Sequence, residues 1–111
     1  MSDIRNYQML IDGNWVDASD GGVFDSVNPA TGAVWSRVPE ATETDVDRAV
    51  KAAHQAFTDG PWAKMTPTER GKCLRKLGDL LAEQSEKLGR TESIDTGKML
   101  KETRWQAKYI A

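Results

Sequence analysis

Up to about residue 40, the chain consists of short β-prone runs separated by turn signals. These runs predict strands at residues 7–11, 14–16, 23–27 and 33–38, the last ended by Pro39. Asp12-Gly13 separates the first two runs and predicts a hairpin with a type I′ turn, because that turn needs positive φ at both central residues. Residues 19–22 and 28–32 predict two further turns.

From residue 42 onward, the apolar positions change to a helical period. Thr42 and Asp45 have the spacing of a capping box, and Gly60-Pro61 marks the end of this first helix. One face of the helix carries the apolar residues Val46, Ala49, Val50, Ala53 and Phe57. We therefore predict a helix from about residue 42 to about residue 59.

The next helix start combines Thr66 as the cap, Pro67 at the first helical position and Glu69 closing the box. Its apolar stripe is Leu74, Leu77, Leu81 and Leu88. Gly78 and Gly89 interrupt the helical run, which predicts either close packing or a break near residues 84–85. Gly97 is predicted to end this region.

A last helix is predicted to begin at Met99, with Leu100, Thr103, Ala107 and Ile110 on one face. No Gly, Asn or Pro follows the last apolar residue, so the pattern predicts a helix that is cut short by the end of the chain. The sequence thus indicates an α+β fold, with strands in about residues 7–39 and helices in about residues 42–111. We expect residues 1–111 to form a single partial domain, truncated at its C-terminus.

Composition excludes several classes of protein. The 111 residues include 15 Lys and Arg against 17 Asp and Glu, a formal net charge of −2 that favours no nucleic-acid partner. No apolar run approaches the roughly 20 residues of a membrane span, and the stretch from Met1 to Arg5 lacks an apolar signal core. One Cys and one His allow neither an internal disulfide nor a two-histidine metal site. We expect a cytoplasmic protein.

Few residues are candidates for a nucleophile, an acid–base catalyst or a ligand-binding side chain. Cys73 lies inside a helical run with no base beside it, and we interpret it as a small residue on a packed helix flank. His54 lies off the apolar stripe and is interpreted as a surface histidine. Asp95-Thr96-Gly97 is the tripeptide of aspartic proteases, but here it follows a helical run instead of a strand. The four Trp residues are spread along the chain and are interpreted as core or interface packing.

Five segments, taken in order, resemble the N-terminal region of the aldehyde dehydrogenase superfamily. They are Ile11–Val16, Asn28–Gly32, Ala41–Phe57, Thr66–Arg70 and Asp95–Lys98. Each segment is a weak signal alone, but their common order and spacing over about residues 7 to 111 is specific.

This resemblance implies part of the α/β cofactor-binding domain of an enzyme that uses NAD or NADP to oxidise an aldehyde to a carboxylic acid. In such enzymes a cysteine thiolate attacks the aldehyde, a hydride passes to the nicotinamide, and a water activated by a glutamate hydrolyses the thioester. These groups lie in later segments of the family, so we expect no catalytic or cofactor-binding residue in this chain, Cys73 included. The resemblance also implies a homo-oligomer, either a dimer or a tetramer.

Some members of the family hold a structural potassium or sodium ion near this region. The matching positions are the backbone carbonyls of Ser26 and Val27 and the carboxylate of Asp95. Three oxygen donors make up part of the shell of about six that a hard cation needs. The alternative interpretation is that Asp95 only caps a helix end.

Two further functions remain open alongside a dehydrogenase fragment. One is a free-standing, non-enzymatic α+β module that binds another chain, and the other is an aspartic protease. A reading frame that continues past the codon for Ala111 would favour the enzyme over the module. Because the family's helices pack against a sheet outside these residues, we expect the isolated chain to be partly unfolded or aggregated.

Overall fold

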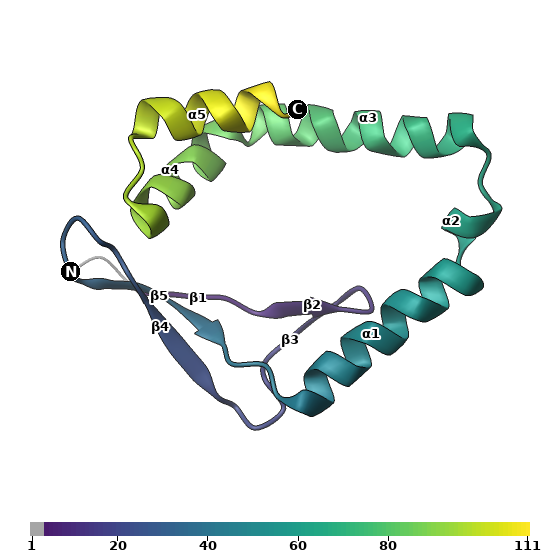
Figure 1. Ribbon diagram of the computed structural model, residues 1–111, viewed down its shortest axis with the longest axis horizontal. Coiled ribbons are helices and arrows are strands. Elements are labelled where there is room, and N and C mark those ends of the chain that lie inside the picture. The colour runs from purple at the N-terminus through teal and green to yellow at the C-terminus, as the bar shows by residue number, and fades with distance from the viewer. Residues whose placement is uncertain (1–3) are drawn as a thin grey trace. The chain divides into compact units, whose positions relative to one another are not determined.

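The structure, a computed structural model, describes residues 4–111 (Figure 1). Met1–Asp3, part of the stretch used above to argue against a signal sequence, lie outside the described residues. The chain divides into two compact units, and the fold is α+β as predicted. The first unit is Met1–Ser26 with Val34–Lys64, and the second is Val27–Ala33 with Met65–Ala111.

The strands of the described residues form a three-stranded sheet and a separate hairpin. The sheet has the order β1-β5-β4, with β1 (Arg5–Asn6) parallel to β5 (Val34–Pro39) and β4 (Val23–Val27) on the other side of β5. The hairpin pairs β2 (Met9–Ile11) with β3 (Asn14–Val16) in antiparallel register. The predicted strand of residues 33–38 is thus shifted by one residue, with Pro39 as its last member.

The predicted hairpin turn is confirmed, because Asp12 has a φ of 51° and Gly13 a φ of 74°. The prediction of one continuous strand from residue 7 to residue 11 was wrong. The backbone N–H of Tyr7 donates to the carbonyl of Arg37 at 2.9 Å, so this residue extends the pairing of β1 with β5. The Tyr7 ring also meets Trp35 edge-on, with the ring centres 6.1 Å apart. The chain leaves the sheet after Tyr7 and only then enters the hairpin.

The helices of the first unit are α1 (Glu43–Thr58) and α2 (Pro61–Lys64). The predicted capping box of α1 is confirmed, since the Thr42 hydroxyl and the Asp45 side chain each accept from the other's backbone N–H. Helix α1 ends just before Gly60-Pro61, also as predicted. The short helix α2 was not predicted from the sequence.

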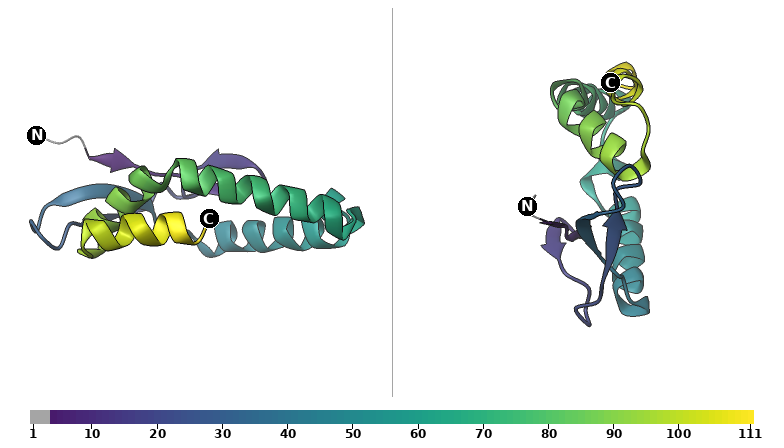
Figure 2. Two further views of the ribbon diagram at one scale, coloured as in Figure 1. Left: turned by 90° about the horizontal axis from the view of Figure 1, so that it is seen from above. Right: turned by 90° about the vertical axis from the view of Figure 1, so that its left-hand side faces the viewer.

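The second unit contains α3 (Pro67–Glu83), α4 (Ser85–Thr96) and α5 (Leu100–Tyr109), and Figure 2 shows α5 beside α4. The capping box of Thr66 and Glu69 is confirmed, and the predicted break falls at Gln84, between α3 and α4. Gly97 ends α4 in the left-handed conformation with a φ of 75°. Helix α5 begins at Leu100, with Met99 as its N-cap, one residue later than expected.

Helices α4 and α5 approach closely at Gly89. A Cβ atom on Gly89 would lie 2.8 Å from both the Cα and the N of Arg104, so only glycine fits between the two backbones. The fully buried Thr103 donates its hydroxyl to the carbonyl of Gly89 at 2.8 Å and contacts the carbonyl of Leu100 at 3.1 Å. The expectation of close packing at Gly89 is thus confirmed.

Few apolar side chains are buried within residues 4–111, and two of the three are alanines. The buried apolar residues are Ile11, Ala18 and Ala107. The segments that carry the predicted apolar stripes form helices α1 and α3. Their apolar faces are nevertheless exposed to solvent, with Phe57 78% exposed and Leu74 60% exposed. No helix of the described part of the chain is long and apolar enough to cross a membrane.

Candidate functional site

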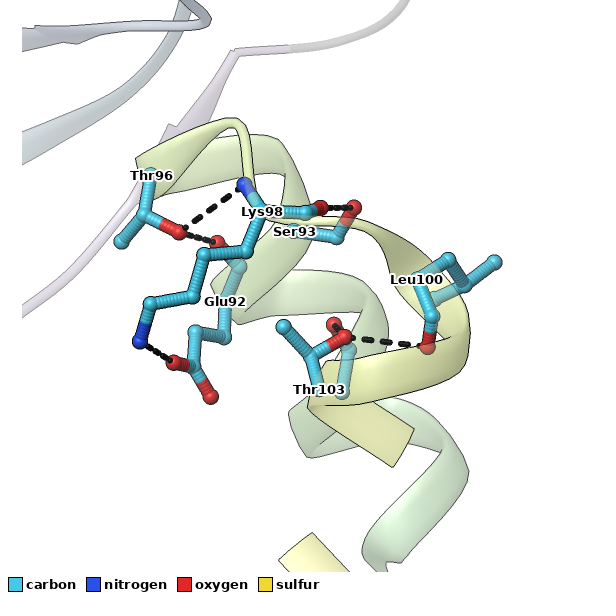
Figure 3. A network of polar contacts seen from close by, with 7 residues as sticks. Glu92, Ser93, Thr96, Lys98, Leu100 and Thr103 are labelled. Carbon is cyan, nitrogen blue, oxygen red and sulfur yellow. Dashed lines mark hydrogen bonds and ion pairs between the residues drawn. The ribbon is translucent and has the colours of Figure 1, made fainter. Parts of the chain in front are cut away.

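A network of polar contacts holds the turn that follows α4 in the second unit (Figure 3). Thr96 donates its hydroxyl to the carbonyl of Glu92 at 2.7 Å, and Ser93 donates its hydroxyl to the carbonyl of Lys98 at 2.8 Å. The Lys98 ammonium lies 2.6 Å from a carboxylate oxygen of Glu92. These bonds fix the last turn of α4 and the entry into α5 as one rigid corner.

Gly97 allows this corner to pack against a second loop of the same unit. A Cβ atom at this position would lie 2.9 Å from Cγ of Pro29, so the proline ring rests against the bare glycine backbone. The Pro29 loop is itself ordered by Asn28, whose side chain accepts from the N–H of Ala30 at 2.9 Å. Two segments that carried the family resemblance, residues 28–32 and 95–98, are therefore in contact.

The three residues predicted to bind a cation fall on different parts of the fold. Ser26 lies in β4 within the first unit, and its hydroxyl accepts from Nε1 of Trp35 at 3.2 Å. Val27 ends β4 and belongs to the second unit, as does Asp95, which is exposed in the last turn of α4. Neither unit by itself holds all three. Among residues 4–111, no group of three or more His, Cys, Asp or Glu side chains could hold a metal ion.

The first unit has its own polar centre at Asp45, whose side chain is buried in the first turn of α1. One carboxylate oxygen accepts from the N–H of Ser19 at 3.0 Å, from the N–H of Thr42 at 3.0 Å and from the Thr42 hydroxyl at 2.9 Å. Arg48 lies 3.7 Å from the other oxygen. The backbone bonds from Ser19 and then Thr42 lower the pKa of Asp45 from 3.8 to about 2, so the carboxylate is ionised at neutral pH.

This Asp45 network does more than cap a helix. The sequence predicted the Thr42 part, because a capping box is local. It did not predict that Asp45 also holds Ser19, which lies 26 residues earlier at the turn before β4. The sequence marked Ser19 only as a short polar residue of the predicted turn at residues 19–22, which does not indicate a bond to Asp45. The network joins the β-rich start of the unit to its main helix.

A third polar cluster joins α4 to α5 in the second unit. One oxygen of Glu86 accepts from Nε of Arg90 at 2.7 Å and from Arg104 at 2.5 Å. The hydrogen bond from Arg90, assisted by Arg104, lowers the pKa of Glu86 below its ordinary 4.5. All three side chains are partly exposed, so this cluster adds to the α4–α5 contact without dominating it.

The residues considered for nucleophilic or acid–base chemistry do not come together. Cys73 is exposed on α3, so the prediction of a packed helix flank was wrong. His54 is exposed on α1, as predicted. Asp95-Thr96-Gly97 spans the end of α4, where the strand context of an aspartic protease is lacking. Trp15 and Trp105 are each more than half exposed, so neither is a core residue of the described chain, and interface packing of these two stays a prediction.

Comparison with known proteins identifies relatives over nearly the whole chain. The model of the "Aldehyde dehydrogenase family" matches residues 15–111. The (Z)-2-((N-methylformamido)methylene)-5-hydroxybutyrolactone dehydrogenase of Acinetobacter baylyi is 44% identical over 108 residues, which are 97% of this chain and 22% of the relative. The mitochondrial aldehyde dehydrogenase family 2 member B4 of Arabidopsis thaliana is 43% identical over 95 residues, covering 86% of this chain and 18% of the relative.

Solved structures agree with these sequence relatives. The NAD-dependent aldehyde dehydrogenase of Sinorhizobium meliloti matches 97% of this chain and 22% of its own with a TM-score of 0.93 and 38% identity. Betaine aldehyde dehydrogenase of Staphylococcus aureus in complex with NAD+ matches 90% of this chain and 20% of its own with a TM-score of 0.87 and 38% identity. The chain spans about a fifth of the length of the relatives it matches.

Proposed function

This chain belongs to the aldehyde dehydrogenase family, and we propose that it is the N-terminal segment of an enzyme that oxidises an aldehyde to a carboxylic acid with NAD or NADP. The observation that carries the proposal is the family match over residues 15–111, which runs from β3 to the end of α5. The similarity to structures with bound NAD+ supports NAD as the cofactor, with NADP as the alternative. The bound nicotinamide would supply the hydride acceptor, outside the residues of this chain.

Within that enzyme, the segment acts as a scaffold. Its helices present apolar faces that stay largely exposed within residues 4–111, with Val50 61% and Phe57 78% exposed on α1. Leu74 and Leu77 on α3 are similarly open. Apolar faces of this size are favourable only when other protein covers them. We propose that the remaining part of the cofactor-binding domain provides that cover.

We further propose that Ser26 and Val27, through their backbone carbonyls, and Asp95, through its carboxylate, bind a potassium or sodium ion in the complete enzyme. All three donors are oxygen atoms, which suits a hard cation, and the shell needs further oxygens from water or from the rest of the protein. The test is the melting temperature of the full-length protein titrated with potassium or sodium chloride, with N-methylglucamine chloride as the ionic-strength control. A rise in wild type that Asp95→Ala abolishes supports the site, and an unchanged melting temperature in wild type rejects it.

The enzyme is further proposed to be a cytoplasmic homo-oligomer, a dimer or a tetramer, that acts on a small-molecule aldehyde. The family membership of the chain supports both the substrate class and the assembly. Sedimentation of the full-length protein tests the oligomeric state. A monomer at micromolar concentration would contradict it.

The decisive experiment is to produce the full-length protein that carries this chain and to follow the reduced cofactor spectroscopically with a panel of aldehydes. We expect turnover that depends on both the aldehyde and NAD+ or NADP+. The chain of residues 1–111 serves as the control and should give none. A full-length protein without aldehyde-dependent turnover would reject the proposal. Binding of residues 1–111 to full-length subunits would instead favour the free-standing module.

A further inference from the structure

The sequence contains three Asp-Gly dipeptides, and the structure places them in very different surroundings. They are Asp12-Gly13 in the β2–β3 turn, Asp20-Gly21 before β4, and Asp59-Gly60 at the end of α1. Among the dipeptides that begin with aspartate, Asp-Gly is the most prone to a well-defined backbone rearrangement, because glycine has no side chain to shield its amide nitrogen. The three sites therefore form an internal comparison.

The rearrangement has two steps that balance without any co-reactant except water. The glycine amide nitrogen attacks Cγ of the protonated aspartic acid, a C–N bond forms, and the carboxyl oxygen leaves as water, giving a five-membered cyclic imide. Water then opens the ring at either carbonyl. One opening restores aspartate, and the other leaves the chain running through Cγ as isoaspartate with a free α-carboxylate. Both the glycine nitrogen and the aspartate carboxyl must be available for the first step.

In Asp20-Gly21 and in Asp59-Gly60, both the aspartate carboxylate and the glycine N–H take part in hydrogen bonds. The N–H of Gly21 donates to the carbonyl of Ala18 at 2.8 Å, and the Asp20 carboxylate accepts from the N–H of Gly22 at 2.8 Å. The N–H of Gly60 donates to the carbonyl of Ala56 at 3.2 Å. The Asp59 carboxylate accepts from the Thr58 hydroxyl at 3.2 Å.

In Asp12-Gly13, both reacting groups, the Asp12 carboxylate and the Gly13 amide nitrogen, are without hydrogen bonds within residues 4–111. Among residues 4–111, neither the Asp12 carboxylate nor the N–H of Gly13 takes part in a hydrogen bond or an ion pair. Both residues are exposed, and a Cβ atom built on Gly13 would meet nothing within 4 Å. Gly21 has the same open space, so the feature that distinguishes residue 12 is that its carboxylate and the following N–H make no hydrogen bond within residues 4–111.

We propose that Asp12-Gly13 is the site at which this protein forms isoaspartate, and that the product is a substrate for an enzyme that methylates isoaspartyl carboxylates from S-adenosylmethionine. The proposal does not depend on aldehyde oxidation. Isoaspartate adds one carbon to the main chain of a two-residue turn that joins Ile11 directly to Asn14. The longer main chain changes the turn geometry that sets the register of Leu10 with Trp15, so we expect the modification to weaken the hairpin.

The test is to age the full-length protein at physiological temperature and to locate isoaspartate by fragmentation mass spectrometry. Enzymatic transfer of a labelled methyl group from S-adenosylmethionine to the aged protein measures the total amount of isoaspartate. The two hydrogen bonds that must first break at each competing site predict that isoaspartate accumulates at residue 12 roughly thirtyfold faster than at residues 20 and 59. In urea, isoaspartate should accumulate at similar rates at residues 12, 20 and 59, because unfolding removes the hydrogen bonds that protect the last two sites.

Two matched variants complete the experiment. Asp12→Glu keeps the charge but cannot form the five-membered ring, so it should remove most of the methyl acceptance. Asp20→Glu should leave it unchanged. Equal or faster accumulation at residue 20 or 59 in the native protein would overturn the proposal. So would a preference for residue 12 that persists in urea, because the cause would then be local sequence.

Discussion

The close approach of α4 and α5 makes Gly89→Ala a sensitive test of the second unit. An alanine Cβ would lie 2.8 Å from the Cα and the N of Arg104 and 3.0 Å from its Cγ. The first two atoms are backbone, so a change of side-chain rotamer cannot relieve the clash. Helix α5 has to move away from α4, which also stretches the 2.8 Å bond from Thr103 to the carbonyl of Gly89.

Two opposing effects set the magnitude. Alanine in place of glycine inside a helix is favourable by about 0.5–1 kcal/mol. Overpacking a close contact typically costs about 1–3 kcal/mol. The packing cost is the larger of the two, so we expect a net destabilisation of about 1 kcal/mol, or about a fivefold increase in the opening equilibrium of this helix pair.

Gly71→Ala provides the matched control, because Gly71 also lies inside a helix but a Cβ atom there meets nothing within 4 Å. Only the helix-propensity gain remains at this site, so Gly71→Ala should stabilise α3 by about 0.5–1 kcal/mol. Hydrogen exchange measured by mass spectrometry on the full-length protein reports both helices separately. Exchange in α4 and α5 should accelerate in Gly89→Ala, whereas exchange in α3 should slow in Gly71→Ala. Slower exchange in both variants would refute the packing argument.

Three further predictions follow from the polar contacts and the exposed faces. Thr103→Val should accelerate exchange in α4 and α5 through the loss of about 1 kcal/mol of hydrogen bonding, whereas Thr103→Ser should not. The stability difference between wild type and Asp45→Asn should be constant at neutral pH and shrink as the pH falls from about 4 towards 2, because a carboxylate with a lowered pKa contributes only while it is ionised; a difference that grows with acid would contradict this. Residues 1–111 produced alone should bind a hydrophobic dye and melt without a cooperative transition, and a sharp thermal transition would contradict the expectation.

The features that were predicted from the sequence are those encoded within a few residues. The two capping boxes, the Asp12-Gly13 turn and the end of the helical region at Gly97 each depend on neighbours no more than four positions away. Such interactions are specified by residue type and spacing, so a single sequence suffices. The helical period of α1, α3 and α4 was detected for the same reason.

The features that escaped prediction depend on distant partners. The bond from Ser19 to Asp45 spans 26 residues, and the contact of Gly97 with Pro29 joins two loops. The departure of Tyr7 from the hairpin depends on the carbonyl of Arg37. Sequence patterning marks these residues as turn or edge positions but carries no information on which of them meet. The cation site of Ser26, Val27 and Asp95 also joins distant residues; only the family resemblance predicted it, and it stays a prediction.

The exposed apolar stripes explain why correct secondary structure here does not amount to an independent fold. Capping boxes stabilise α1 and α3 by about 1 kcal/mol each, which is too little to hold helices of 16 and 17 residues in water by themselves. Most helical stability in proteins comes from packing of the apolar face, and in α1 that face leaves Phe57 78% exposed. The missing stabilisation must therefore come from protein that covers these faces. This requirement is physical and independent of family membership, and it leads to the same proposal of a segment that is integral to a larger enzyme.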